Sequence, residues 1–307
     1  VTEREIMNKI LFLSLALFVA ETVSAEEGLQ PYLFFGNSGQ TIEDTNESIS
    51  TALSVSGFEV LGQYSPAESP ERSVLVVSHP ELLTALSDLR PSAGFFSAIR
   101  IGLISVNGNT LIPLQNPEYW GNAYLQDEYS KAEAVINNLS SKISKTIQAE
   151  FTAASLGSGY GSSQEFTQED LREYHYMFGM PYFEDNLLIG EFESYQQAVA
   201  AIEKNLQSSE TCSKVFVRDL PGKEVKLYGI ALKGETGEGQ FVPIIDIAQQ
   251  KHVTFLPYEL LVVGKEVRML HGRFRIALSF PDLTMGTFTK IMSTPGEIED
   301  LLSSLTK

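Results

Sequence analysis

The sequence is poor in the residues that most often carry metal and redox chemistry. Among 307 residues there is one cysteine, Cys212, and there are four histidines. A single thiol excludes an internal disulfide and a cysteine-based zinc cluster, so stability must come from packed cores. No C-x-x-C-H run is present, which excludes covalently attached haem. The histidines, at 79, 175, 252 and 271, lack the short spacing of a zinc-binding helix or hairpin, and we predict no metal site.

Basic residues are also scarce. The chain has 22 Lys and Arg against 39 Asp and Glu, a formal charge of −17. Such a surface repels the phosphates of nucleic acids and the headgroups of anionic lipids. We therefore expect no nucleic acid partner and no membrane partner for the mature protein. The expected partner is a small molecule or another protein, of unknown identity.

Recognisable catalytic motifs are missing. The sequence has no nucleophile elbow, no phosphate-binding loop and no dinucleotide fingerprint. Gly157 to Gly161 is rich in glycine, but no predicted strand precedes it, so we interpret it as part of a linker. These absences favour a non-catalytic binding or interaction module. An enzyme or a b-type haem protein, with its site in the first domain or the interdomain cleft, is the alternative.

A short apolar run near the N-terminus predicts a signal peptide. Met7-Asn8-Lys9 precedes the apolar residues Ile10 to Ala20, and Val23-Ser24-Ala25 offers small residues for cleavage before Glu26. Eleven apolar residues are too few to cross about 30 Å of hydrocarbon as a helix. We assign residues 1–25 to the signal peptide, with residues 1–6 as an upstream extension. The predicted location is periplasmic or secreted.

The strongest structural signal lies between Arg100 and Trp120. Two apolar runs flank Asn107-Gly108, a dipeptide whose preferred backbone angles form a tight hairpin turn. A similar pattern recurs between Leu256 and Asp282, where we expect a second hairpin with its turn at residues 271–273. The chain therefore contains two copies of one unit in this interpretation.

Hydrophobic periodicity and helix caps predict the same order of elements in both copies. In the first copy, helices begin at Thr41, Pro80 and about Tyr129, and strands cover residues 32–35, 58–64 and 73–77. In the second copy, helices begin at Ser194 and Thr294, and strands cover residues 186–192, 214–217, 225–232 and 241–247. The pattern predicts the α+β class, with two related domains that each have a mainly antiparallel sheet and helices on one face.

Composition sets the expected domain boundaries. Ala153 to Gln164 is dense in glycine and serine, which is typical of a flexible linker. We therefore predict a first domain at 26–150, a linker and connecting segment at 151–184, and a second, diverged copy at 185–307. Two such copies can cover each other's free sheet faces. We expect a pseudo-two-fold pair of domains in a monomeric protein.

Several short motifs resemble the family called domain of unknown function 302. They are Gly57 to Gly62, His79-Pro80, Pro91 to Gly94, Asn116 to Tyr119 and, in the second copy, Leu256 to Leu260. The resemblance covers roughly residues 32–147 and, more faintly, 187–305. It implies a tandem arrangement of this α+β fold and no particular chemistry, because no common activity is established for the family. The second copy lacks the Gly-Phe strand start and the Tyr-Trp pair.

One aromatic cluster is a candidate ligand site. The segment NPEYWGNAY holds the only tryptophan together with a carboxylate and two amides. Such a mixture can bind a small polar ligand or a partner surface. The alternative is that Tyr119 and Trp120 cap the open end of the sheet. The candidate binding residues are Asn116, Glu118, Tyr119, Trp120, Asn122 and Tyr124.

A second segment raises the alternative of haem. His175, Met177 and Met180 cluster among aromatic residues and are of the types that serve as axial haem ligands. Methionine and tyrosine beside a linker can instead simply pack it onto a domain. No cofactor is predicted, and haem stays an alternative.

The export hypothesis predicts a defined N-terminus. The exported protein should begin at or near Glu26 when its N-terminal sequence is determined, because Val23-Ser24-Ala25 matches the small-residue cleavage pattern. A mature protein that keeps residues 10–20 would contradict the prediction.

Overall fold

The structure is a computed structural model that describes residues 28–151 and 157–307, so the predicted signal peptide lies outside the described residues. It is of the predicted α+β class. The elements up to residue 172 are β1 (Tyr32–Asn37), α1 (Ile42–Val55), β2 (Glu59–Tyr64), η1 (Pro66–Glu68), β3 (Arg72–Ser78), α2 (Pro80–Ser87), η2 (Pro91–Phe96), β4 (Ile99–Val106), β5 (Asn109–Gln115), α3 (Pro117–Leu125), η3 (Gln126–Glu128), α4 (Tyr129–Glu150), β6 (Ser158–Tyr160) and α5 (Gln168–Arg172).

The remaining elements repeat much of this order. They are β7 (Leu187–Glu191), α6 (Tyr195–Ser208), β8 (Cys212–Asp219), β9 (Val225–Leu232), α7 (Glu238–Ile245), η4 (Val253–Phe255), β10 (Tyr258–Val263), β11 (Glu266–Met269), α8 (Gly272–Ser279), α9 (Met285–Phe288), η5 (Thr289–Ile291) and α10 (Thr294–Ser304). The antiparallel sheets have the orders β2-β3-β4-β5-β1-β6 and β8-β9-β10-β11-β7. The five strands β7 to β11 therefore follow the same spatial order as β1 to β5.

Local sequence signals explain where several elements begin and turn. Asn107 and Gly108 have φ angles of 51° and 80°, as the predicted hairpin turn between β4 and β5 requires. The Thr41 side chain accepts a hydrogen bond from the Asp44 backbone N–H and caps α1. Gly57, with φ of 89°, follows the C-terminus of α1.

The second hairpin lies elsewhere than predicted. Its turn is at Gly264-Lys265, between β10 and β11. The segment with the predicted turn instead starts α8, and the His271 ring accepts a hydrogen bond from the Arg273 backbone N–H as the cap. Residues 241–247, predicted as a strand, mostly belong to α7. Both errors concern short, almost wholly apolar runs, for which periodicity cannot distinguish a buried helix from a buried strand.

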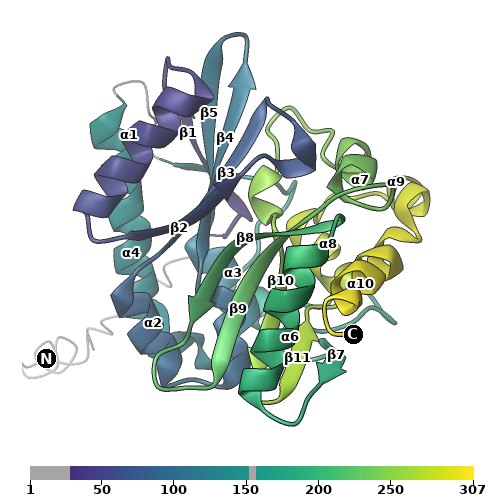
Figure 1. Cartoon of the computed structure of the whole chain (residues 1–307). Coiled ribbons are helices and arrows are strands. Elements are labelled where there is room, and N and C mark those ends of the chain that lie inside the picture. The colour runs from purple at the N-terminus through teal and green to yellow at the C-terminus, as the bar shows by residue number, and fades with distance from the viewer. Residues whose placement is uncertain (1–27, 152–156) are drawn as a thin grey trace, which may run out of the picture.

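Helices cover one face of each sheet. α1 packs on β2, β3, β4 and β5, and α4 packs on α1 and β1. On the second sheet α6 packs on β8, β10 and β11, and α10 packs on β7. Figure 1 shows α1 and α4 on one side of the molecule and α6 and α10 on the other, with the sheets between them.

The remaining sheet faces are covered reciprocally. We call the elements up to residue 172 the first half and those from residue 187 on the second half. η2 of the first half packs on β9 and β10, while η4 of the second half packs on β3, β4 and β5. The approach is close: a Cβ on Gly94 would lie 2.8 Å from side-chain atoms of Leu261 and Val225. A Cβ on Gly102 would lie 2.7 Å from Val253. The larger of the two hydrophobic cores therefore contains residues of both halves.

Two edge strands also meet. β2 and β8 end their respective sheets and contact each other, and a Cβ on Gly62 would lie only 2.2 Å from the Val215 carbonyl oxygen. Arg218 of β8 forms an ion pair with Glu59 of β2. Each edge is thus shielded by the other, which protects both from pairing with another chain.

Residues 157–164, predicted to be flexible, are packed. β6 pairs with β1, with Tyr160 opposite Tyr32. The glycines here allow close approach, since a Cβ on Gly159 would lie 2.9 Å from Gln30 and one on Gly161 would lie 2.7 Å from the Tyr32 ring. Glycine is therefore abundant in this part of the segment because larger side chains would collide with neighbouring residues. Residues 152–156 lie outside the described residues.

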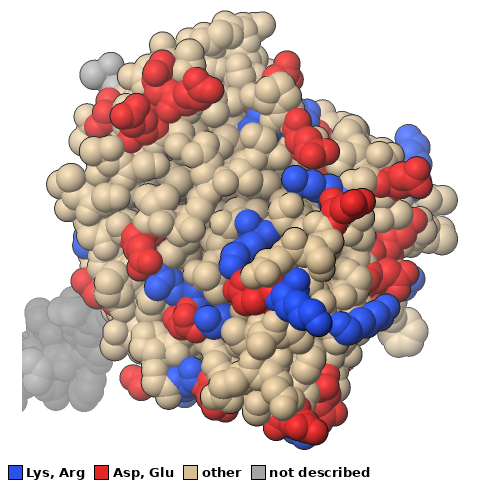
Figure 2. All heavy atoms as spheres, in the orientation of Figure 1, with Lys and Arg blue, Asp and Glu red and all other residues tan. Residues whose placement is uncertain are grey.

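The surface is divided by charge. Figure 2 shows acidic side chains over α1 and a mixture of both signs over β8, β9 and α6, where Lys214–Glu203 and Lys226–Asp219 form ion pairs. Within residues 28–151 and 157–307, no helix is both long and apolar enough to cross a membrane.

A buried charge network joins the halves. Arg100 of β4 and Arg275 of α8 both pair with Glu259 of β10, and all three side chains are buried. Arg275 Nη1 lies 2.6 Å from Glu259 Oε2, and Arg100 Nη1 donates to Gln115 Oε1 at 3.1 Å. Burial, with the nearby Arg275 charge, lowers the pKa of Arg100 to about 9, so the guanidinium stays charged at neutral pH.

Removing the carboxylate from this network should be costly. We predict that Glu259→Ala lowers the free energy of unfolding by about 3–5 kcal/mol, because it leaves two buried guanidinium groups without their counterion. Glu191→Ala is the matched control, since its pair with Lys265 is exposed and should contribute far less to stability. Urea unfolding of both variants measures the difference, and equal losses would contradict the prediction.

A second buried carboxylate also bridges the halves. Glu238 of α7 accepts hydrogen bonds from the Ala67 N–H at 2.9 Å and from the Tyr64 hydroxyl at 3.2 Å, both in the first half. It also accepts from the Leu232 N–H at 3.2 Å. Burial raises the pKa of Glu238 to about 7, and these hydrogen bonds only partly oppose the shift.

This shift predicts a pH dependence of stability. Because the pKa of Glu238 rises from 4.5 to about 7 on folding, the folded state binds the proton more tightly than the unfolded state. The free energy of unfolding should therefore rise as the pH falls from about 8 to about 5, by up to about 3 kcal/mol at about 1.4 kcal/mol per pKa unit.

Glu238→Gln should remove this rise in the free energy of unfolding at low pH. Urea titrations of the wild type and the variant across this pH range measure the difference. The pKa of His252 is lowered on folding, to about 4, which costs stability as the pH falls below about 6.5, but it does so in both proteins. Parallel pH profiles of wild type and Glu238→Gln would contradict the assignment.

Candidate binding cleft

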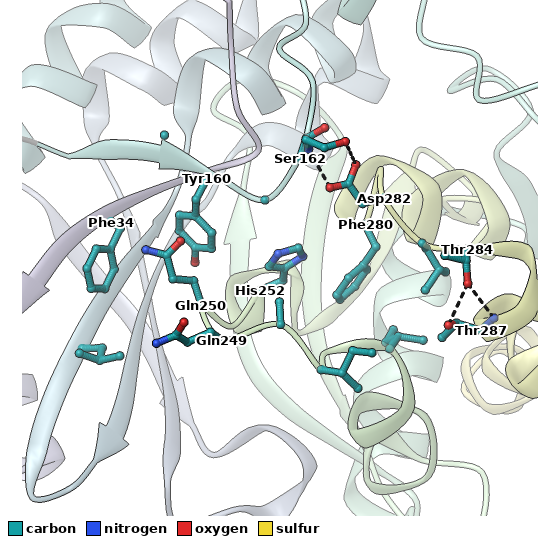
Figure 3. A pocket seen from close by; sticks show the side chains of 18 of the residues that line it. Phe34, Tyr160, Ser162, Gln249, Gln250, His252, Phe280, Asp282, Thr284 and Thr287 are labelled. Carbon is teal, nitrogen blue, oxygen red and sulfur yellow. Dashed lines mark hydrogen bonds between the residues drawn. The ribbon is translucent and has the colours of Figure 1, made fainter.

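A cleft of about 940 Å³ opens where the two halves meet. Its wall on the first half is formed by Phe34 of β1, Leu111 of β5 and residues 159–163, which we call the β6 segment. The loop at 247–252 and the segment at 280–287 form its wall on the second half. Figure 3 shows side chains from both walls around one hollow. The volume falls within the range of about 300–1,000 Å³ that is typical of small-molecule sites.

The β6 segment ties the walls together. Tyr160 lies edge-on to Phe34, with ring centroids 6.4 Å apart, and its hydroxyl donates to the Lys251 carbonyl oxygen at 2.6 Å. The Ser163 N–H and hydroxyl donate to the Asp282 carboxylate at 2.7 and 2.8 Å. These hydrogen bonds therefore hold three segments around one cavity, namely the β6 segment, the loop at 247–252 and the segment at 280–287.

His252 is a buried residue of the cleft wall. Its Nδ1 lies 3.1 Å from the Ser279 carbonyl oxygen, which can only accept, so Nδ1 carries the proton and Nε2 keeps its lone pair. The ring stacks on Phe280, with centroids 4.8 Å apart and an interplanar angle of 27°. Burial lowers the pKa of His252 to about 4, so the imidazole is neutral at pH 7.

The cleft is nearly free of charge. Among the described residues that line it, Asp282 is the only Asp or Glu, and none is Lys or Arg. Burial raises the pKa of Tyr160 well above its ordinary value, so the phenol is neutral too. The remaining polar groups are the amides of Gln249 and Gln250 and hydroxyls of serine and threonine, among them Ser162, Thr284 and Thr287.

The sequence-predicted aromatic cluster lies elsewhere. Its residues belong to α3 and its cap, and none of them lines the cleft. The Tyr119 hydroxyl donates to the Leu278 carbonyl oxygen at 3.0 Å, and Trp120 Nε1 donates to the Pro31 carbonyl oxygen at 2.8 Å. Both rings are buried, as is Tyr124.

The polar members of the cluster are engaged nearby. Asn116 caps α3 and donates to the Gln30 carbonyl oxygen at 2.8 Å. Asn122 accepts from Arg172 Nε at 2.8 Å, and Glu118 is half-buried. A ligand role for the cluster stays a prediction, and these contacts tie α3 to β1, α5 and α8.

The three residues of the haem alternative line two different hollows, and His175 lines the larger one, of about 530 Å³. His175 Nε2 lies 2.8 Å from the Met180 carbonyl oxygen, and its ring stacks on Tyr182 at 4.1 Å. Met177 and Met180 line a separate hollow of about 60 Å³, and His175 does not line it. Haem binding stays untested. In the described part of the chain, no group of three or more His, Cys, Asp and Glu could hold a metal ion.

Sequence reasoning missed the residues of the cleft. The spacing of His252 from the other histidines gives no signal, and Gln249 and Gln250 lie in a loop without any motif. Tyr160 offered one usable signal, because a large aromatic side chain between glycines is unusual in a flexible linker. The contacts of Phe34 and Phe280 depend on how the halves pack.

Comparisons with known proteins give a match only among solved structures. No family model matches the chain, and no curated protein matches it. Among solved structures, the chain is similar to the crystal structure of the uncharacterized conserved protein DUF302 from Bacillus stearothermophilus, with 17% sequence identity and a TM-score of 0.31. The match covers 41% of this chain and 98% of that chain.

Proposed function

We propose that the protein is an exported, non-catalytic binding protein whose cleft takes a small, uncharged, hydroxyl-rich ligand such as a saccharide. The observation that carries this proposal is the composition of the cleft, which combines aromatic rings, two amides and several hydroxyls with a single carboxylate. That carboxylate, on Asp282, already accepts two hydrogen bonds from Ser163.

Each part of the cleft favours this ligand class. The rings of Phe34 and Phe280 offer apolar faces for the C–H face of a sugar ring. The amides of Gln249 and Gln250 can both donate to and accept from hydroxyl groups. Phosphorylated and carboxylated ligands are disfavoured, since no described residue of the cleft supplies a cation to offset the cost of burying their charge.

We also propose that the halves are two copies of a 302-type unit, with domains at 26–150 and 185–307. The shared strand order of the two sheets and the reciprocal contacts of η2 and η4 support this origin. The proposed export depends on the sequence pattern from Met7 to Ala25. In this arrangement the cleft exists because the two copies meet.

One observation favours an enzyme as the second candidate. Nε2 of His252 keeps a lone pair in the wall of the cleft, as a general base would. However, a pKa of about 4 makes this imidazole a weak base at neutral pH, so a hydrogen-bond acceptor role is favoured.

Calorimetric titration of the full mature chain with neutral mono- and oligosaccharides tests the proposal. At least one should bind, while its phosphorylated counterpart should bind at least tenfold more weakly. The double variant Gln249→Ala/Gln250→Ala should weaken binding about tenfold or more, since it removes two amides that face the ligand. Gln207→Ala, on the exposed surface of α6, is the matched control.

Absence of binding by every neutral saccharide, or preference for the phosphorylated compounds, would contradict the ligand class. Turnover of a bound saccharide that Gln249→Ala/Gln250→Ala retains but His252→Gln loses would favour the enzyme instead.

A further inference from the structure

A methionine-rich apolar surface lies behind the cleft, on the other side of α9. Thr284 and Thr287 face the cleft, whereas Met285 and Phe288 line a separate hollow of about 60 Å³ with almost no polar surface. We call this hollow the methionine groove and define it by the following six residues. They are Met177, Met180, Ile276, Leu283, Met285 and Phe288.

Large apolar side chains at the groove, and one next to it in sequence, are exposed to water. Phe178 is fully exposed, although its neighbour Met177 lines the groove. Met177 and Met285 are each about half-exposed, at 45% and 57%. A contiguous apolar surface of this kind marks an interaction site far more often than single exposed residues do. Methionine suits such a site because its flexible, polarisable side chain adapts to different partners.

An acidic surface adjoins the groove. Glu165, Glu169, Asp170 and Glu173 line the neighbouring hollow, and Tyr176 belongs to both hollows. We call these four carboxylates the acidic rim. Among the described residues that line the two hollows, Arg273 is the only Lys or Arg. The two surfaces together therefore offer apolar anchoring beside a net negative charge.

We propose that the methionine groove and the acidic rim form a docking surface for a cationic amphipathic segment of another protein. The hollow has room for the end of one apolar anchor residue, and Phe178 adds contact area beside it. Basic residues of the partner lie against the acidic rim, which steers the encounter and fixes the orientation. This surface is separate from the cleft and does not depend on what the cleft binds.

Charge selects this occupant over two others. A second copy of the chain would bring two acidic rims and two surfaces of net charge −17 together, which like-charge repulsion opposes. A bilayer with anionic lipids would be repelled for the same reason. A cationic amphipathic segment can bury its apolar residues in the methionine groove and place its basic residues against the acidic rim.

Synthetic peptides test the proposal on the full mature chain. The probe is a helical peptide with leucine at positions i, i+3, i+4 and i+7 and lysine at most other positions. Fluorescence anisotropy should show binding of this peptide. A version with glutamate for lysine, and another with serine for leucine, should each bind at least tenfold more weakly, because each lacks one of the two required features.

Protein variants locate the site. Phe178→Ser and Met285→Ser should each weaken binding of the lysine–leucine peptide at least tenfold, and both residues are exposed enough for the fold to tolerate the change. Val55→Ser, at an 86% exposed position on α1, is the matched control and should have no effect. Glu169→Gln/Glu173→Gln should weaken binding severalfold at low salt and make no difference near 1 M salt, where the Debye length is about 3 Å.

Three results would overturn the proposal. The first is equal binding of the lysine and glutamate peptides, or binding that Phe178→Ser leaves intact. The second is concentration-dependent dimerisation of the wild type that Phe178→Ser abolishes, which would make a second copy the occupant. The third is binding to vesicles of zwitterionic lipid that Phe178→Ser abolishes, which would identify a membrane.

Discussion

The fold depends on the mutual covering of two sheet faces. Each sheet has helices on one face, and the other face is too apolar to be left in water. η2 and η4 cover these apolar faces reciprocally, since each packs on the sheet of the opposite half. Gly94 and Gly102 permit the contact, because a side chain at either position would collide with the opposite half. The larger hydrophobic core therefore takes its buried residues from both halves.

Buried charges make this contact specific. Glu259 needs both Arg100 and Arg275, and these side chains come from different halves. Desolvating three charges is expensive, so the arrangement is tolerated only where their geometry is satisfied. The network therefore penalises any displacement of one sheet against the other. Glu238 adds a second polar link, to Tyr64 and the Ala67 backbone.

Both candidate interaction surfaces follow from the same packing. The cleft forms where the halves meet at β6, which closes it through the Tyr160 and Ser163 hydrogen bonds. The methionine groove lies behind α9 and shares Leu283 with the cleft wall. The short segment from 280 to 288 thus separates a nearly uncharged cavity of mixed polarity from an apolar surface.

The sequence by itself determined the features that depend on local interactions. Asn107-Gly108 fixes its turn because few other dipeptides tolerate two successive positive φ angles, and Thr41 caps its helix through a hydrogen bond three residues away. The α+β class followed from such signals. Tertiary structure decided whether the apolar runs at 241–247 and 274–280 became helix or strand, since both conformations bury them equally well. It also decided that the glycines of β6 serve close packing, and it brought Phe34, Tyr160, His252 and Phe280 to one cleft. No periodicity or spacing encodes that meeting, because it arises from the contact between the two halves of the chain.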